Sequence, residues 1–294
     1  MRWCLAALAL LVCLGAAPAP QPPVWVIADD DTEITLFATV HALPPDLDWL
    51  STEAARRLDR ADTLVLETLI PDDRAAFAAT LQRLGTSAAL PPLAERLPAD
   101  LLSRLQASAA ALGLPLALFE TMHPWLIAVS IGEATLASVG VVSANGVEPA
   151  LLARSSAPRE GLETPEQQLG YFANLSVEDQ LAMLDSTLAE VAGAREDIDR
   201  LIGLWQRGAV DAIAAEFAGE ANASPALREA LLAGRNRRWA EQLDARMARP
   251  GRIFVAVGAA HFGGEDGLLS ELAARGWPAR EIAAPALAFS PALP

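Results

Sequence analysis

The sequence predicts an α/β protein with a central mixed sheet, flanking helices and a large helical insert. Short runs rich in Val, Ile, Leu and Phe, typical of buried strands, occur near both ends of the chain. Longer segments with apolar residues at helical spacing separate these runs, which gives the alternation of strands and helices found in α/β proteins. Of the 294 residues, 52% are hydrophobic, enough for a full core.

The N-terminal end predicts a secretory signal peptide over residues 1–20. Arg2 supplies the positive charge at its start, residues 5–14 are apolar, and small residues follow at 15–19. The apolar stretch is shorter than the roughly 18 residues that cross a bilayer. We therefore expect cleavage, export to a bacterial periplasm, and no stable membrane span afterwards. The alternative is an uncleaved signal that anchors the protein in the inner membrane.

The mature chain is expected to form a single domain over residues 21–294, with the helical insert at about 72–130. Both cysteines, Cys4 and Cys13, precede it, which excludes disulfides and thiolate metal ligands from the mature chain. All 22 basic residues are arginines, against 37 acidic residues, and the net charge is −15. This charge excludes nucleic acid and anionic lipid as general partners. The oligomeric state stays unknown from the sequence.

The elements follow in a regular order along the chain. The N-terminal part predicts strands at 24–27 and 34–40 around an acidic hairpin turn, a helix at 51–60, and a strand at 63–66. In the insert, Leu101, Leu105 and Ala109 recur at helical spacing. The C-terminal part predicts a helix at 148–154, a strand at 159–162, helices over 178–208, 210–217 and 225–249, a strand at 253–257, a helix at 267–275 and a strand near 280–283. Thr164 and Gln167 predict a capping box at a helix start.

Two of the three histidines follow apolar strands. His41 ends the run that begins at Ile34, and His261 follows the strand at 253–257 after a turn of small residues. Histidine is the side chain best suited to proton transfer and metal ligation near neutral pH. His123 precedes a proline in the helical region and is interpreted as structural.

Polar residues at other strand ends extend this candidate site. Glu67 and Glu163 each follow a predicted strand, and ligands of α/β sheets bind at the carboxyl ends of strands. Glu67 at an exposed edge and Glu163 at a helix N-terminus are the structural alternatives. Arg235 and Asn236 begin a charged run that is either a solvated helix face or a binding site for a substrate carboxylate or carbonyl.

With these residues assembled, the chain resembles the TraB/PrgY/GumN family, and within it the exported GumN-like bacterial branch. The resemblance is carried, in the family order, by residues 36–45, 64–67, 124–125, 161–168, 235–239 and 254–261. It implies paired Gly-x-x-His motifs and a glutamate at a hydrolase or protease site, similar to that of Tiki-type metalloproteases. Two positions depart from the family: Ala38 stands where a glycine is expected, and Gly146-Val147-Glu148 stands for Gly-Val-Asp.

Two functions follow as hypotheses. The first is an exported metal-dependent hydrolase, possible substrates being a peptide or a small glycan-like molecule. A divalent metal (Mn²⁺, Co²⁺ or Zn²⁺) would be held by His41, His261 and Glu67, with Glu67, Glu163, Arg235 and Asn236 as catalytic residues. In a metal-free form, His41 would act as general base and Glu67 would orient it. The second is a non-catalytic periplasmic binding or regulatory protein linked to polysaccharide or peptide handling.

Overall fold

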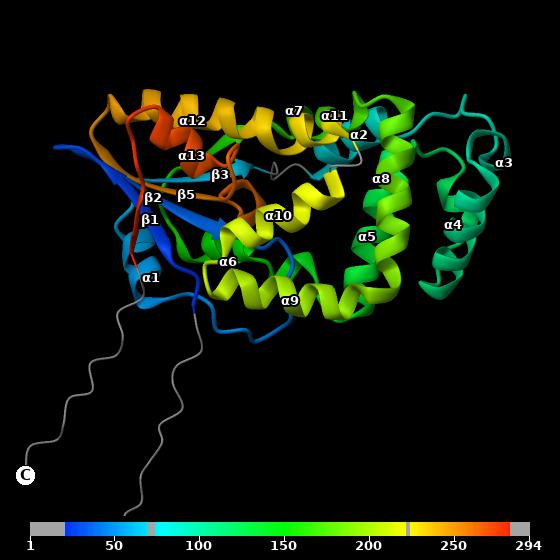
Figure 1. Cartoon of the computed structure of the whole chain (residues 1–294), viewed down its shortest axis with the longest axis horizontal. Helices are drawn as coiled ribbons and strands as arrows, with labels where there is room; N and C mark the ends of the chain where they lie inside the picture. The colour runs from blue at the N-terminus through cyan, green and yellow to red at the C-terminus, as the bar shows by residue number, and fades with distance from the viewer. Residues whose placement is uncertain (1–20, 70–73, 222–223, 283–294) are drawn as a thin grey trace, which may run out of the picture.

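The structure is a computed structural model that describes residues 21–69, 74–221 and 224–282. The predicted signal peptide, with both cysteines, lies outside the described residues. Six strands form one mixed sheet in the order β4-β3-β5-β2-β1-β6 (Figure 1). They are β1 (Val24–Ala28), β2 (Thr32–Thr39), β3 (Thr63–Thr68), β4 (Arg159–Glu163), β5 (Gly251–Gly258) and β6 (Arg280–Ile282). The predicted α/β class with a central mixed sheet is confirmed.

Four neighbouring strands, β4, β3, β5 and β2, run parallel. β1 pairs antiparallel with β2, which confirms the predicted hairpin, and β6 pairs antiparallel with β1. Parallel strands need helical crossovers. Helices therefore follow β2 and β3 in the chain. β5, the last of the four parallel strands in sequence, lies between β3 and β2. This order sets the carboxyl ends of β2, β3, β4 and β5 at one edge of the sheet.

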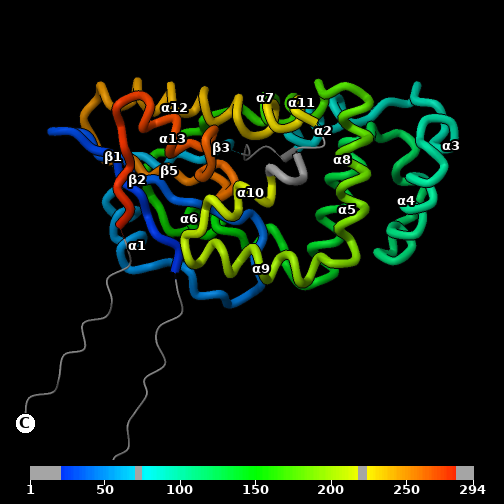
Figure 2. The backbone as a smooth tube through the Cα atoms, in the orientation of Figure 1, coloured from blue at the N-terminus to red at the C-terminus, as the bar shows by residue number. Residues whose placement is uncertain are grey.

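The helices pack on both sides of the sheet and extend beyond it (Figures 1 and 2). They are α1 (Thr52–Asp59), α2 (Arg74–Gly85), α3 (Leu93–Arg96), α4 (Ala99–Ala111), α5 (Pro124–Ser138), α6 (Val147–Arg154), α7 (Pro165–Ala173), α8 (Val177–Glu190), α9 (Ala194–Gln206), α10 (Val210–Ala221), α11 (Pro225–Arg228), α12 (Gly234–Met247) and α13 (Leu268–Ala274). The predicted capping box of Thr164 and Gln167 begins α7. None of the helices in the described ranges is long and apolar enough to cross a membrane.

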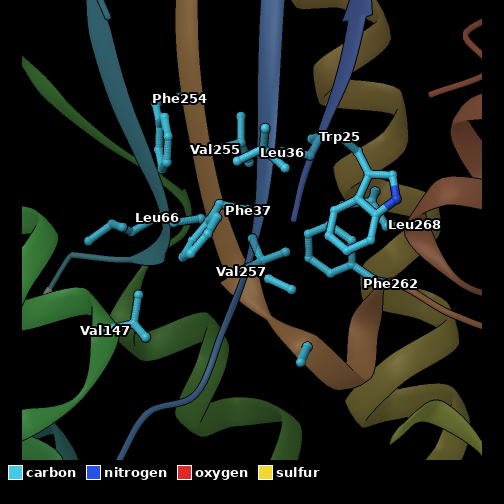
Figure 3. Close-up of a cluster of buried hydrophobic side chains, with 14 of the residues drawn as sticks. Trp25, Leu36, Phe37, Leu66, Val147, Phe254, Val255, Val257, Phe262 and Leu268 are labelled. Atoms are coloured by element: carbon cyan, nitrogen blue, oxygen red, sulfur yellow. The ribbon is translucent and has the colours of Figure 1, made fainter. Parts of the chain in front are cut away.

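The main core lies between the sheet and its flanking helices. Phe37 of β2 and Phe254 of β5 have ring centroids 5.8 Å apart, and Trp25 of β1 packs on Phe262 at 5.0 Å (Figure 3). At most 4% of the surface of each of these four residues is exposed. Their contacts fix the register of the strands, because a slip by one residue would turn them to the opposite face.

A second apolar core stabilises a helical lobe, formed by α3, α4, α5 and α8, at the end of the molecule away from the sheet (Figure 2). Leu105 of α4, Ile127 and Ile131 of α5 and Leu184 of α8 are fully buried in it. The predicted helical insert supplies α3, α4 and the first part of α5, whereas α8 comes from a later part of the chain. The lobe is thus built from two segments, and a boundary at residue 130 describes only one of them.

Candidate functional site

The strand register brings the candidate residues to one edge of the sheet. Thr39 of β2 pairs with Gly258 of β5, and Thr68 of β3 pairs with Glu163 of β4. Glu67 precedes Thr68, so it lies at nearly the same level. In parallel sheets this edge is where ligands bind, because loops and helix starts converge there.

Arg235, from the first turn of α12, lies between two glutamates. Its Nη2 donates to Glu67 Oε2 at 2.6 Å and to Glu163 Oε2 at 2.9 Å, and its Nε donates to both oxygens of Glu163 at 3.1–3.2 Å. All three residues are at most 6% exposed. The guanidinium also stacks on Trp239 and Tyr171, at 4.6 Å and 5.5 Å from the ring centroids. Two buried carboxylates sharing one cation leave this triad with a net negative charge.

Glu67 is ionised in this environment. Burial alone would raise the pKa of its carboxyl, but the charges of Arg235 and His41 and the backbone N–H of Gly258 hold the pKa well below its usual range. The Gly258 N–H donates to Oε1 at 2.7 Å. A carboxylate held by a cation and a backbone amide is a fixed anion and a weak base.

His261 is a neutral ring with a fixed tautomer. Its Nδ1 lies 2.7 Å from Oδ1 of Asn236, whose Nδ2 donates to the carbonyl of Asp266 at 2.7 Å. This orientation of the amide, assigned from the hydrogen bonds, makes Nδ1 the protonated nitrogen and leaves the lone pair on Nε2. Burial and Arg235 lower the pKa of His261 to about 3. Nε2 lies 3.3 Å from Arg235 Nη1 and 3.9 Å from Glu67 Oε1.

His41, just past β2, has a different partner from the one expected. Its Nδ1 lies 2.8 Å from Oε1 of Glu148 in α6, and Thr39 donates its hydroxyl to the same oxygen at 2.5 Å. Loss of water around the ring would by itself lower the pKa of His41. The hydrogen bond to Glu148 and the negative charge of Glu148 outweigh this effect and raise the pKa. The side chain stays 64% exposed to the adjoining cavity, so water screens this attraction.

Gly258 is the point around which these groups meet. A Cβ atom at this position would lie 3.0 Å from Glu67 Oε1, 3.5 Å from His41 Nε2 and 3.6 Å from His261 Cδ2. Its φ of −54° is ordinary, so glycine is needed here for space and not for backbone freedom. The hydrogen atom of Gly258 thus lets two imidazoles and a carboxylate approach one point.

A cavity of about 660 Å³ opens onto this point. His41, Gly258 and His261 form its polar end at the sheet edge. Side chains of α5, α8, α9 and α10 form its walls, which are mainly apolar but include charged residues such as Glu133, Asp197 and Arg200. Glu67, Glu163 and Arg235 do not line it. The two histidines are therefore the members of the cluster that a ligand in the cavity meets first.

The donor types at this point fit a divalent transition metal. Each imidazole uses Nδ1 for an oxygen partner, Glu148 for His41 and Asn236 for His261, in the manner of ligating histidines and their outer partners. Glu67 adds a carboxylate oxygen. Within the described residues no group of three His, Cys, Asp or Glu side chains has the spacing of a ready-made metal site. The chemistry fits, while the spacing is not that of a preformed site.

The structure assigns different partners to some of the expected residues. Arg235 and Asn236 are not on a solvated face, and they are not free to orient a substrate carbonyl, because their polar groups hold Glu67, Glu163 and His261. Glu67 does not orient His41, since Glu148 does so. The sequence pointed to Glu148 only as a departure from the family pattern.

Ala38 does not distort the first histidine motif. It lies within β2, paired with Val257, at 1% exposure. Its φ is not positive, since in the described residues only Asp46 among non-glycines has a positive φ. Its carbonyl accepts a hydrogen bond from Trp205 Nε1 at 2.8 Å. The additional methyl group is thus accommodated in an ordinary strand.

Two further polar residues of α7 belong to the cluster and were not predicted as site residues. Gln168 Nε2 donates to Glu67 Oε2 at 3.3 Å, and Tyr171 donates its hydroxyl to Glu163 Oε1 at 3.0 Å. A helical repeat from the capping box at Thr164 puts positions 168 and 171 on one side of α7. That periodicity, together with the polar residue types, is the signal that would have identified them.

The chain is similar to known proteins over most of its length. The model of the TraB/PrgY/gumN family matches residues 23–280. Among curated proteins, the chain is 26% identical over 250 residues to "Uncharacterized protein YbaP" of Escherichia coli strain K12, covering 84% of this chain and 90% of that protein. It is 27% identical over 236 residues to the protein of the same name from Shigella flexneri, covering 79% and 85%. No solved structure matches it significantly.

Proposed function

The chain belongs to the TraB/PrgY/gumN family, and we propose that it is a metal-dependent hydrolase whose reaction centre lies around Gly258. We propose His41, Glu67 and His261 as the residues that hold a divalent metal there. The observation that carries the proposal is the approach of all three side chains to Gly258, at the polar end of one cavity.

The residues of the chain have separate tasks in this proposal. Asn236 holds the proton of His261 on Nδ1, so that Nε2 keeps its lone pair. Glu148 does the same for His41 once that ring is neutral. Arg235 keeps Glu67 in place and compensates part of the negative charge. A bound divalent metal would supply a water of lowered pKa and polarise the bond to be cleaved.

The walls of the cavity favour a peptide over a glycan-like substrate. Leu136, Ile198, Ile213 and Leu231 are among the side chains that line it. Such apolar walls can bury the apolar side chains of a peptide, while Glu133, Asp197 and Arg200, which also line the cavity, can pair with its polar groups. We propose a short peptide with apolar side chains as substrate, encountered after export to the periplasm.

A non-catalytic binding protein is the second candidate, and one observation favours it. Nη1 of Arg235 lies 3.3 Å from His261 Nε2, so a cation already faces the nitrogen that would bind the metal. In that case the cavity would bind its peptide without cleaving it, and the buried charges would serve to hold the cavity's polar end.

A peptide library separates the two candidates. Metal-free protein is incubated with Mn²⁺, Co²⁺ or Zn²⁺ and a proteome-derived library, and new termini are counted by mass spectrometry. We expect metal-dependent cleavage that is lost in His41→Gln and His261→Gln and kept in His123→Gln. The last variant removes the third histidine, which precedes α5 outside the cluster. Binding of peptides with no new termini under any metal would favour the binding protein. Chelator-resistant cleavage lost only in His41→Gln would favour the metal-free form.

A further inference from the structure

Four arginines surround a second cavity, of about 310 Å³, at the opposite edge of the sheet. This arginine cavity is lined mainly by Arg56, Arg57 and Arg60 of α1 and its C-terminal end, Arg252 of β5, and Glu33 and Thr35 of β2. It lies at the amino ends of β2 and β5, whereas Gly258 lies at the carboxyl end of β5. β2 has eight residues, so the two sites are separated by roughly 23 Å.

The local charge is opposite to that of the whole protein. The chain carries a net charge of −15, yet the lining of the arginine cavity has four guanidinium groups and one carboxylate, that of Glu33. The other carboxylates that pair with these arginines, Glu53 and Asp62, lie outside the lining. The four arginines exceed these three carboxylates by one, so the surroundings of the cavity keep a net positive charge.

Three of the four guanidiniums are held in place and still have donors to spare. Arg57 uses Nε for Glu53 at 2.6 Å and Nη1 for Glu33 at 2.8 Å. Arg56 uses Nε and Nη2 for Glu53, and Arg252 uses Nε and Nη2 for Asp62. Each keeps one terminal nitrogen with no hydrogen-bond acceptor among the described residues, namely Nη2 of Arg57 and Nη1 of the other two.

Arg60 has no polar side-chain partner in the described part of the chain. It is the exposed C-cap of α1, where its backbone N–H bonds to carbonyls of the last turn. The dipole of α1 stabilises an arginine at its C-terminus, which explains Arg60 alone. It does not explain why Arg252 of β5 lines the same cavity. The five donors of Arg60 are thus available to a ligand in the arginine cavity.

We propose that the arginine cavity binds a phosphate group. A phosphate has several acceptor oxygens and close to two negative charges, and arginine forks pair with it in a bidentate manner. A carboxylate has two oxygens and one charge, and it would satisfy only one or two of the guanidiniums. The phosphate can come from a soluble phosphate ester or from a lipid headgroup, and both present the same oxygens.

Calorimetric titration of the full chain at low ionic strength tests the proposal with phenyl phosphate, inorganic phosphate and benzoate. We expect one saturable phosphate site per chain, weaker binding of benzoate, and affinity that falls as salt is added. Arg60→Gln should weaken phosphate binding about tenfold or more, the usual effect of losing a charge-assisted hydrogen bond. Flotation with phosphatidylcholine vesicles, with and without phosphatidic acid, shows whether the phosphate of a lipid headgroup also binds.

The control is Arg207→Gln. Arg207 is the exposed C-cap of α9, with φ −87° and ψ −1°, close to the φ −100° and ψ −4° of Arg60. Both variants remove one positive charge from the same kind of position, and only Arg60 lines the arginine cavity. Binding to phenyl phosphate or to acidic vesicles that depends on Arg60 and not on Arg207 supports the proposal. Absence of saturable binding to either probe, or equal effects of the two variants, overturns it.

Discussion

Replacing Arg235 by methionine is the sharpest test of the buried cluster. The change removes the cation that joins Glu67 to Glu163 and keeps an unbranched side chain that matches arginine as far as Nε. In the folded protein it leaves two carboxylates, 5% and 6% exposed, without their shared partner. Neither can reach water without disturbing the sheet edge, so the variant either loses stability or takes up a proton.

The expected loss is large compared with the stability of an ordinary domain. Breaking a buried ion pair by removing one partner costs about 3–5 kcal/mol, whereas typical domains have roughly 5–15 kcal/mol in total. The matched control is Arg237→Met, two residues further along α12. Arg237 pairs with Glu229 at the exposed surface, and such a pair contributes about 0–1 kcal/mol.

The loss should depend on pH in a defined direction. In the wild-type protein the lowered pKa of Glu67 stabilises the fold above pH 4.5, and this contribution disappears as the pH falls through that lowered pKa. Without Arg235, burial dominates and raises the pKa of Glu67. Glu67 of the variant therefore takes up a proton in mild acid, which reduces the loss of stability. The difference between wild type and variant should therefore be larger at pH 7 than at pH 4.5.

Urea unfolding followed by circular dichroism at pH 7 and pH 4.5 measures this difference. We expect Arg235→Met to lose about 3–5 kcal/mol at pH 7 and clearly less at pH 4.5, with Arg237→Met within about 1 kcal/mol of wild type at both. A loss below about 1 kcal/mol at pH 7, or a loss of the same size at both pH values, would refute the reasoning.

Three further predictions concern the rest of the site. Gly258→Ala places a methyl group 3.0 Å from a carboxylate oxygen of the cluster. Cleavage of the best library peptide should therefore fall about tenfold, while the melting temperature changes little. Unchanged turnover would show that the site is not crowded there. Asn236→Ala frees the tautomer of His261 and should weaken metal binding by roughly 10–100-fold in a calorimetric titration, with Asn236→Asp intermediate; equal affinities would contradict the positioning role. Glu148→Gln removes the partner that raises the pKa of His41. The pair of His41 and Glu148 stabilises the fold fully below pH 6.5, and this stabilisation is lost as the pH rises through the folded-state pKa of about 9. In metal-free protein this variant should lose stability at pH 6 and approach wild type at pH 10, and a loss independent of pH would argue against the pair.

Local sequence patterns predicted the strands of the sheet and polar residues at the carboxyl ends of four of them, His41, Glu67, Glu163 and His261. His41 and His261 follow strands whose apolar runs are continuous because both faces are buried, and such strands are recognisable from composition alone. Their proximity follows from the parallel pairing of β2 with β5. That pairing joins segments more than 200 residues apart, so only the general rule for strand ends indicated it.

The partners of these residues depended on information that local patterns lack. Glu148 reaches His41 because α6 packs beside the end of β2, and nothing near Glu148 in the sequence specifies that packing. Arg235 lies in a run of charges that resembles a solvated face. Trp239 and Leu243 mark the buried face of α12, and Arg235 is one turn before Trp239, so helical periodicity would have placed it inside.

Metal binding by purified full-length protein tests the central proposal most directly. Chelator-treated protein is titrated with Mn²⁺ and the bound ion is followed by electron paramagnetic resonance, with calorimetry for stoichiometry. We predict one ion per chain, lost in His41→Ala and in His261→Ala and retained in His123→Ala. Absence of stoichiometric binding of Mn²⁺, and of Co²⁺ or Zn²⁺ in parallel titrations, or binding that survives both substitutions, would contradict a metal centre at Gly258.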